Sequence, residues 1–233
     1  MHPTALIISA RTRARELGSQ DPRAKRLSRL ANDPIVALDV DGVLGDFESH
    51  WAVCAREVLG RPVVKVNERH SLGVRYGLTS KEVDAVWRAF HGDGHDGRWG
   101  TMPLYDHAHD LVYALEDLGC RVWAVTSIDP RHAPARAKSL DGLIPAKRVV
   151  CVGHAAPADE KADVLHHLGA VAFLDDHPAN ANAALGTVLV SALLQRGYEG
   201  LEPPEHGVTV IDDLMDFPVL VEELFKRTGR MVA

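Results

Sequence analysis

The sequence predicts an α/β protein with a three-layer, Rossmann-like parallel sheet and a small helical cap inserted after the first strand. Three observations lead to this fold class. From residue 102 onward, short apolar runs of strand length alternate with segments of helix length, which is typical of parallel sheets. The first apolar run, residues 35–38, contains no polar position, as expected for a strand covered on both faces. Residues 45–101 show helical periodicity but no second buried strand.

These patterns divide the 233 residues into three parts. We expect residues 1–33 to be a basic, partly helical N-terminal extension, residues 34–44 and 102–233 to form the core, and residues 45–101 to form the cap. Between residues 11 and 29 the extension carries seven basic and two acidic side chains. We interpret it as a solvated arm, and a contact with nucleic acid or a protein partner is the alternative.

Composition narrows the class of protein. The formal net charge of -6 excludes a chain-wide nucleic-acid-binding surface. The cysteines at 54, 120 and 151 form no C-x-x-C pair, which argues for free thiols in a reducing compartment and against a zinc site. The apolar run at residues 6–8 is too short for a signal peptide or a membrane span. We therefore expect a cytoplasmic protein without a membrane partner.

The cap is predicted to contain two helices. Aromatic and aliphatic residues from Phe47 to Leu59 recur at helical spacing, and a second helix begins after an N-cap at Thr79 or Ser80. A glycine-rich loop, residues 91–100, then returns the chain to the core. The aromatic side chains could stack on a nucleobase or form the cap's own core. We favour the core for Trp51 and Trp87 and leave both roles open for Phe47.

The core elements follow in alternation. Helices are predicted over residues 108–118, 133–140, 159–168 and 219–225, with another beginning at Pro178, and strands over 121–125, 149–152, 171–174, 187–190 and 208–211. Gly119 and Gly169 are suited to end the helices that precede them. Proline is common at the first position of a helix, where Pro178 stands.

Polar pairs follow three of the predicted strands. They are Asp39 with Asp41, Thr126 with Ser127, and Asp175 with Asp176. The carboxyl ends of parallel strands meet at one edge of a sheet, so the three pairs can converge there. Asp39 and Asp41 share one side of an extended backbone, and two like charges so close require a cation or a shared proton. Carboxylates bind Mg²⁺ and hydroxyls bind phosphate, so we predict a phosphoryl-transfer site.

These motifs resemble those of a known family. Asp39-Val40-Asp41-Gly42-Val43 is similar to the first motif of the haloacid dehalogenase (HAD) superfamily of phosphatases, and Thr126 to the second. A lysine at the start of a helix upstream of the fourth strand is similar to the third motif, and Asp175-Asp176 to the fourth. Within the superfamily, residues 41–48, 125–127 and 174–178 resemble the 5′(3′)-deoxyribonucleotidase group, as does a helical cap after the first motif.

The resemblance implies roles for these residues. Asp39 would be the nucleophile that forms an aspartyl-phosphate, and Asp41 the general acid and base. Mg²⁺ would be held by Asp39, by Asp41 through its backbone carbonyl, and by at least one of Asp175 and Asp176. The phosphate would be bound by Thr126, Ser127, the amide of Gly42 and a lysine. We favour Lys161 for that lysine, with Lys138 and Lys147 as alternatives.

The resemblance also implies a function. It is that of a Mg²⁺-dependent phosphomonoester hydrolase, a 5′-nucleotidase acting on (deoxy)nucleoside monophosphates. We expect Phe47, Arg98 and His177 to contact the substrate. The alternatives are a phosphatase for another small phosphometabolite or for a nucleic-acid end, and a catalytically silent binding protein. The intact pair of Asp39 and Asp41 argues against the silent protein, and a homodimer is left open.

Overall fold

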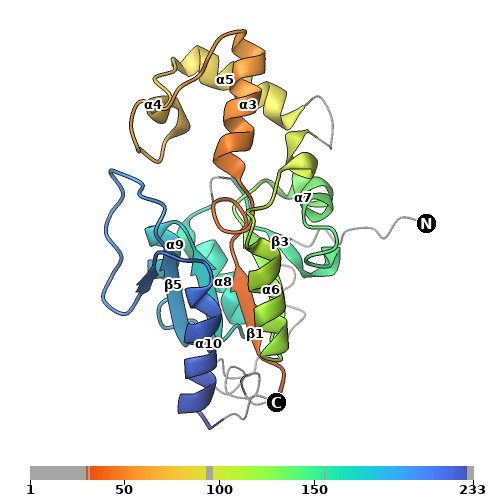
Figure 1. The fold of residues 1–233 in the computed structure, drawn as a ribbon, viewed down its shortest axis with the longest axis vertical. Helices are drawn as coiled ribbons and strands as arrows, with labels where there is room; N and C mark the ends of the chain where they lie inside the picture. Colours follow the sequence, from red (N-terminus) through yellow and green to blue (C-terminus); the bar gives the residue numbers. More distant parts are fainter. Residues whose placement is uncertain (1–29, 31, 93–96, 155, 230–233) are drawn as a thin grey trace, which may run out of the picture.

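The computed structural model describes residues 30, 32–92, 97–154 and 156–229. Most of the predicted N-terminal extension, residues 1–33, therefore lies outside the described residues. The described chain forms a six-stranded sheet in the order β3-β2-β1-β4-β5-β6 (Figure 1). Every pair of neighbouring strands is parallel, which confirms the predicted fold class. No helix in this part of the chain is both long and apolar enough to span a bilayer.

The three strands that carry the polar pairs, β1, β2 and β4, lie side by side in the sheet. The bounds of all six strands are β1 (Ile35–Leu38), β2 (Arg121–Thr126), β3 (Val149–Cys151), β4 (Ala172–Asp175), β5 (Val190–Leu194) and β6 (Thr209–Ile211). β1 and β4 are buried at every position, as central strands covered on both faces should be. β1 lies between β2 and β4, so the carboxyl ends of all three are adjacent.

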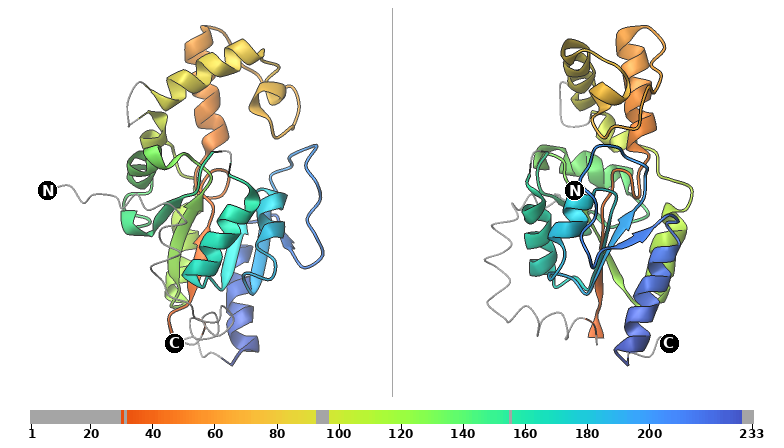
Figure 2. Two further views of the ribbon diagram at one scale, coloured as in Figure 1. Left: turned by 180° about the vertical axis from the view of Figure 1, so that it is seen from behind. Right: turned by 90° about the vertical axis from the view of Figure 1, so that its left-hand side faces the viewer.

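Helices cover both faces of the sheet. They are α6 (Ala108–Asp117), α7 (Ala133–Ser139), α8 (Ala158–Leu168), α9 (Pro178–Ala183) and α10 (Asp216–Arg227), with short 3-10 turns η2 (Pro130–His132) and η3 (Ala146–Arg148). α6 and α10 lie against one face, and α8 and α9 against the other (Figure 2). Each face buries its own apolar cluster, so the molecule has the three expected layers.

The fifth strand differs from its prediction. The sequence pattern placed it at residues 187–190, but β5 spans Val190–Leu194. The amides of Thr187 and Val188 instead donate to the carbonyl of Ala184, at 3.0 and 3.1 Å, and close the turn after α9. Ser191 interrupts the apolar run in the sequence. Its buried hydroxyl donates to the carbonyl of Ala181 at 2.7 Å, so the residue fits inside the strand.

A separate helical unit stands between β1 and α6. It contains α3 (Phe47–Leu59), α4 (Leu72–Arg75), α5 (Ser80–His91) and the 3-10 turn η1 (Arg98–Thr101). Thr79 and Glu82 form a capping box at the start of α5, so Thr79 is the N-cap. The unit's apolar cluster around Trp51 and Phe90 also includes Ile128, Ala135 and Cys151 of the core. The unit lies beyond one end of the sheet (Figure 1). We call residues 45–101 the cap.

The chain leaves and re-enters the core at one point. The amide of Asp46 donates to the carbonyl of Pro103, and the amide of Tyr105 to the carbonyl of Leu44, both at 2.9 Å. The outgoing and returning segments are therefore paired as a short antiparallel ladder. A second tether joins the cap to the loop after β5, where the amide of Glu199 donates to the carbonyl of Glu68 at 2.8 Å.

Candidate active site

Three buried carboxylates converge at the ends of β1 and β4. Asp39 follows β1, Asp175 is the last residue of β4, and Asp176 comes next. One carboxylate oxygen from each lies within 4.8 Å of the others. Because β1 and β4 are neighbouring parallel strands, the sheet itself brings these side chains together.

A buried lysine lies against this carboxylate cluster. Lys161 is only 1 % exposed, and its Nζ lies 2.7 Å from Asp175 Oδ2 and 2.9 Å from Asp39 Oδ1. The two alternative lysines, Lys138 and Lys147, are exposed. Of the three candidates, the structure therefore brings Lys161 to the site. One ammonium group against three carboxylates leaves two negative charges in excess when all are ionised.

The ionisation of the cluster reflects its burial and this excess charge. Burial raises the pKa of Asp39 well above its ordinary value, although Lys161 acts in the opposite direction. Burial and the charge of Asp175 raise the pKa of Asp176 to about 7. Burial lowers the pKa of Lys161, but Asp175 and Asp39 outweigh it, so the net shift is upward. A divalent cation would relieve the repulsion, and hard oxygen ligands suit it, so the residues present fit such a cation.

The carboxylates are held in place by hydrogen bonds from the protein. Asp175 Oδ1 accepts from the backbone amide of His177 at 2.8 Å and from Asn180 Nδ2 at 3.1 Å. Asp176 Oδ2 accepts from the hydroxyl of Tyr198 at 2.8 Å. These hydrogen bonds orient the carboxylates of Asp175 and Asp176. The half-buried ring of His177 packs on that of His70, with centroids 4.7 Å apart.

Gly42 lies directly against the carboxylate cluster. Its φ of +83° is in the left-handed region that favours glycine. A Cβ at this position would lie 1.8 Å from Asp176 Oδ2. The amide that we expected to bind phosphate donates instead to the carbonyl of Gly45 at 3.0 Å. The structure therefore gives Gly42 a steric role, leaving room for Asp176, and gives its amide another partner.

Gly42→Ala is expected to lower cation binding and turnover together, by at least about tenfold, because the new methyl group displaces the Asp176 carboxylate. A Mg²⁺ titration followed by thermal unfolding would measure the first effect. Gly142→Ala is the matched control, since Gly142 has a similar φ of +78° and open space around its Cβ position. If both variants lose cation binding and turnover to the same extent, the cause is backbone strain at a positive φ and not the contact with Asp176.

Asp41 lies apart from the carboxylate cluster. The sequence predicted that its backbone carbonyl would be a metal ligand. Its side chain turns toward α7, where Arg136 Nη2 lies 2.6 Å from Oδ1 and 2.8 Å from Oδ2. An ion pair with a guanidinium occupies this carboxylate, so any contribution to a metal site comes from the backbone carbonyl, as expected from the resemblance. The side chain of Asp41 remains 23 % exposed.

The two hydroxyl residues after β2 occupy different environments. Thr126 is fully buried, and its Oγ1 has no hydrogen-bond partner among the described residues. Ser127 lines the cavity between the cap and the core. The structure thus brings Ser127 to the cavity, whereas Thr126 does not line it.

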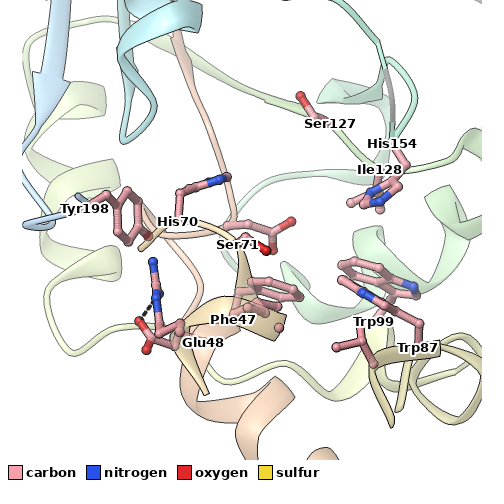
Figure 3. A pocket seen from close by; sticks show the side chains of 15 residues that line it. Phe47, Glu48, His70, Ser71, Trp87, Trp99, Ser127, Ile128, His154 and Tyr198 are labelled. Atoms are coloured by element: carbon pink, nitrogen blue, oxygen red, sulfur yellow. Dashed lines mark hydrogen bonds and ion pairs between the residues drawn. The ribbon is translucent and has the colours of Figure 1, made fainter. Parts of the chain in front are cut away.

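Two adjoining cavities of about 370 and 420 Å³ lie between the cap and the core. The larger contains Asp39, Lys161 and Asp176, and the smaller extends toward Trp87 and Trp99. Asp41 and Phe47 line both, so the two cavities lie next to one another. In Figure 3 the Trp87 and Trp99 side chains lie on the opposite side of the smaller cavity from His70 and Tyr198.

Phe47 packs against the apolar cluster of the cap and also lines both cavities. Its ring is nearly parallel to that of Trp99, with centroids 5.8 Å apart, and lies 6.0 Å from that of Trp87.

Arg98, another expected substrate contact, is not brought to the site. Its guanidinium pairs with Glu57 on α3, and it lines neither cavity.

Several residues at the site were not found from the sequence. The Glu48 carboxylate accepts a hydrogen bond from Arg75 Nη1 at 2.6 Å, and both residues line the smaller cavity. The guanidinium of Arg75 lies 4.7 Å from the centre of the Tyr198 ring, so cap and core meet at this point. Glu48 ends the stretch of residues 41–48 that resembles the deoxyribonucleotidase group, but the sequence analysis gave it no role. Arg75, Arg136 and Tyr198 carry no local signal.

Comparisons with known proteins bear on the fold. No protein-family profile matches the sequence, and no curated protein matches it significantly. Among solved structures, it is similar to a haloacid dehalogenase-like family hydrolase from Xanthomonas campestris, with 13% identity over 85% of this chain and 98% of that one and a TM-score of 0.55.

Two further structures agree with that match. One is a HAD family hydrolase from Deinococcus radiodurans with bound phosphate and sodium, at 15% identity over 83% of this chain and 96% of that one, TM-score 0.54. The other is the L-2-haloacid dehalogenase RSc1362, at 14% identity over 81% and 98%, TM-score 0.53. The chain therefore has the HAD-like fold.

Proposed function

We propose that this protein is a Mg²⁺-dependent phosphatase of the HAD superfamily that acts through an aspartyl-phosphate on Asp39. The observation that carries the proposal is the cavity in which Asp39, Lys161 and Asp176 lie together and which Asp41 also lines. A nucleophile, a cation that offsets its charge and a second carboxylate for proton transfer are what phosphomonoester hydrolysis requires.

The first half of the reaction forms the covalent intermediate. The carboxylate of Asp39 attacks phosphorus, and the bond from phosphorus to the ester oxygen breaks with its electron pair on oxygen. Asp41 supplies a proton to that oxygen when the leaving group needs one. Lys161, 2.9 Å from Asp39, offsets the negative charge that would repel the phosphate. Ser127, which lines the cavity, is suited to donate to a phosphate oxygen.

The second half regenerates the enzyme. Water attacks phosphorus while Asp41 accepts its proton, and the bond between phosphorus and Asp39 breaks with its electron pair returned to the carboxylate. Mg²⁺, held by Asp39, Asp175, Asp176 and the backbone carbonyl of Asp41, would supply positive charge that lowers the repulsion between phosphate and carboxylates.

For the substrate we propose a nucleoside 5′-monophosphate. The rings of Phe47, Trp87 and Trp99 line the cavity that continues from Asp41, and they offer apolar surface for a base. Stacking of a base on an aromatic ring contributes about 1–3 kcal/mol. The alternatives remain another small phosphometabolite and a nucleic-acid end, and hydrolysis of a 2-haloacid is the alternative reaction because a dehalogenase shares the fold.

A hydrolysis screen of the full chain tests both parts of the proposal. Nucleoside 5′- and 3′-monophosphates, sugar phosphates, p-nitrophenyl phosphate and a 2-haloacid are supplied with Mg²⁺, and phosphate or halide release is measured. We expect phosphate release that EDTA abolishes, and a kcat/KM for nucleotides at least about tenfold above that for sugar phosphates. Equal rates for both classes would contradict the nucleotide assignment, and halide release alone would contradict the reaction.

A further inference from the structure

Arg136 is a fully buried charge whose described ion-pair partner is Asp41. The side chain is 0 % exposed, and Nη2 contacts both carboxylate oxygens of Asp41, at 2.6 and 2.8 Å. Arg136 lines neither of the two cavities, so it cannot reach a substrate directly. Whatever it contributes to chemistry, it contributes through Asp41.

The guanidinium is itself held from two further sides. Its Nη1 lies 3.3 Å from the Met102 sulfur, on the segment that returns from the cap. Its Cζ lies 5.1 Å from the centre of the Trp99 ring in η1. Helix α7, the returning segment and the cap thus fix the guanidinium in one place. An anchor fixed in this way also fixes the carboxylate that it binds.

The ion pair also fixes the orientation of Asp41. A fully buried guanidinium requires a partner, since an unpaired buried charge is very costly. Arg136 Nη2 lies within hydrogen-bond distance of both oxygens of Asp41, so the carboxyl group is held in one orientation. Asp41 is exposed to the cavity on its other side, so its remaining lone pairs are open to a water molecule.

Resting on the proposed function, we propose that Arg136 is a positioning residue that holds Asp41 as an oriented base for hydrolysis of the aspartyl-phosphate. In that step the water oxygen bonds to phosphorus, the phosphorus–Asp39 bond breaks, and the water proton passes to Asp41. The preceding step with p-nitrophenyl phosphate needs little from Asp41, because p-nitrophenolate leaves without a proton. Loss of Arg136 should therefore slow the second half of the reaction and spare the first.

Arg136→Met in the full chain tests this with p-nitrophenyl phosphate and Mg²⁺. Met is apolar and fills similar space, and Asp41 can be solvated from the cavity, so the variant is expected to fold. We expect kcat to fall by at least about tenfold, while kcat/KM, which reports the steps up to phosphorylation of Asp39, changes less than about twofold. Stopped-flow traces should show a p-nitrophenol burst that approaches one per active site.

Two further variants sharpen the test. Arg136→Lys keeps a positive donor toward Asp41 and should recover part of the lost kcat. Lys138→Met removes a positive charge from the same helix, where the side chain is exposed, and should leave both constants unchanged. Thermal unfolding of each variant reports its stability.

Three outcomes would overturn the inference. An equal fall of kcat and kcat/KM without a burst would assign Arg136 to packing alone, and an unchanged kcat in Arg136→Met would remove it from the reaction. Both leave the proposed phosphatase standing. If the unmodified protein releases no phosphate from any substrate, the proposed function fails, and the role of Arg136 fails with it.

Discussion

Asp39→Asn should abolish phosphate release, with kcat lowered by at least about 10⁴-fold. Asparagine has the shape of aspartate but no carboxylate to attack phosphorus, so no covalent intermediate can form. The variant should remain folded, because it removes one of three buried negative charges beside Lys161 and so reduces their repulsion. Phosphate release and thermal unfolding, measured on the same preparation, separate loss of chemistry from loss of structure.

Asp163→Asn is the control for this substitution. Asp163 is exposed on α8, two residues after Lys161. The substitution therefore makes the same chemical change at a position outside the cavity. Its activity should match that of the unmodified protein. Undiminished activity in Asp39→Asn would remove Asp39 as the nucleophile and leave the carboxylate cluster a binding role only.

The largest effect on stability is expected for Lys161→Met. The ammonium group is buried between Asp39 and Asp175, and its removal leaves three buried carboxylates without a cation. Breaking a buried pair in this way costs about 3–5 kcal/mol of the free energy of unfolding. Denaturant unfolding without divalent cations measures that loss. Added Mg²⁺ should raise the Tm of this variant more than that of the unmodified protein, because it then offsets a larger charge.

Lys226→Met provides the comparison for an exposed pair. Lys226 lies 2.7 Å from Glu222 on α10, and both side chains are open to water. Loss of this exposed ion pair should lower the free energy of unfolding by less than about 0.5 kcal/mol. If Lys161→Met is no less stable than Lys226→Met, the buried lysine does not stabilise the carboxylate cluster, and its place in the third motif needs another explanation.

The fold could be predicted from the sequence because its signals are local. Each buried strand is a short apolar run, and Gly169, with a φ of +68°, ends α8 where expected. The meeting of Asp39, Asp175 and Asp176 followed from one general property, that parallel strands end at a common edge. Lys161 was favoured over Lys138 because it starts a helix at a suitable distance before the fourth strand, and the structure brings Lys161 to Asp39 and Asp175.

The parts that escaped prediction depend on contacts between distant residues. Arg136 and Asp41 are 95 residues apart in the sequence, and nothing near Arg136 indicates that its side chain turns inward. The pairing of Tyr198 with Asp176 requires the path of the loop after β5. Arg98 was expected at the substrate because of its cap loop, but an acidic neighbour on α3, Glu57, holds it elsewhere.

The ladder where the chain leaves and re-enters the core has a consequence for how such a protein can diversify. Leu44 and Tyr105 are joined by a backbone hydrogen bond, and Gly45 pairs with Leu104, so the two ends of the cap are neighbours. Insertions between adjacent chain ends leave the parent domain's own contacts intact. A cap of another length can therefore join the same two chain ends. Such a cap would have to keep the contact between Trp99 and Arg136, because that contact helps to hold the guanidinium beside Asp41.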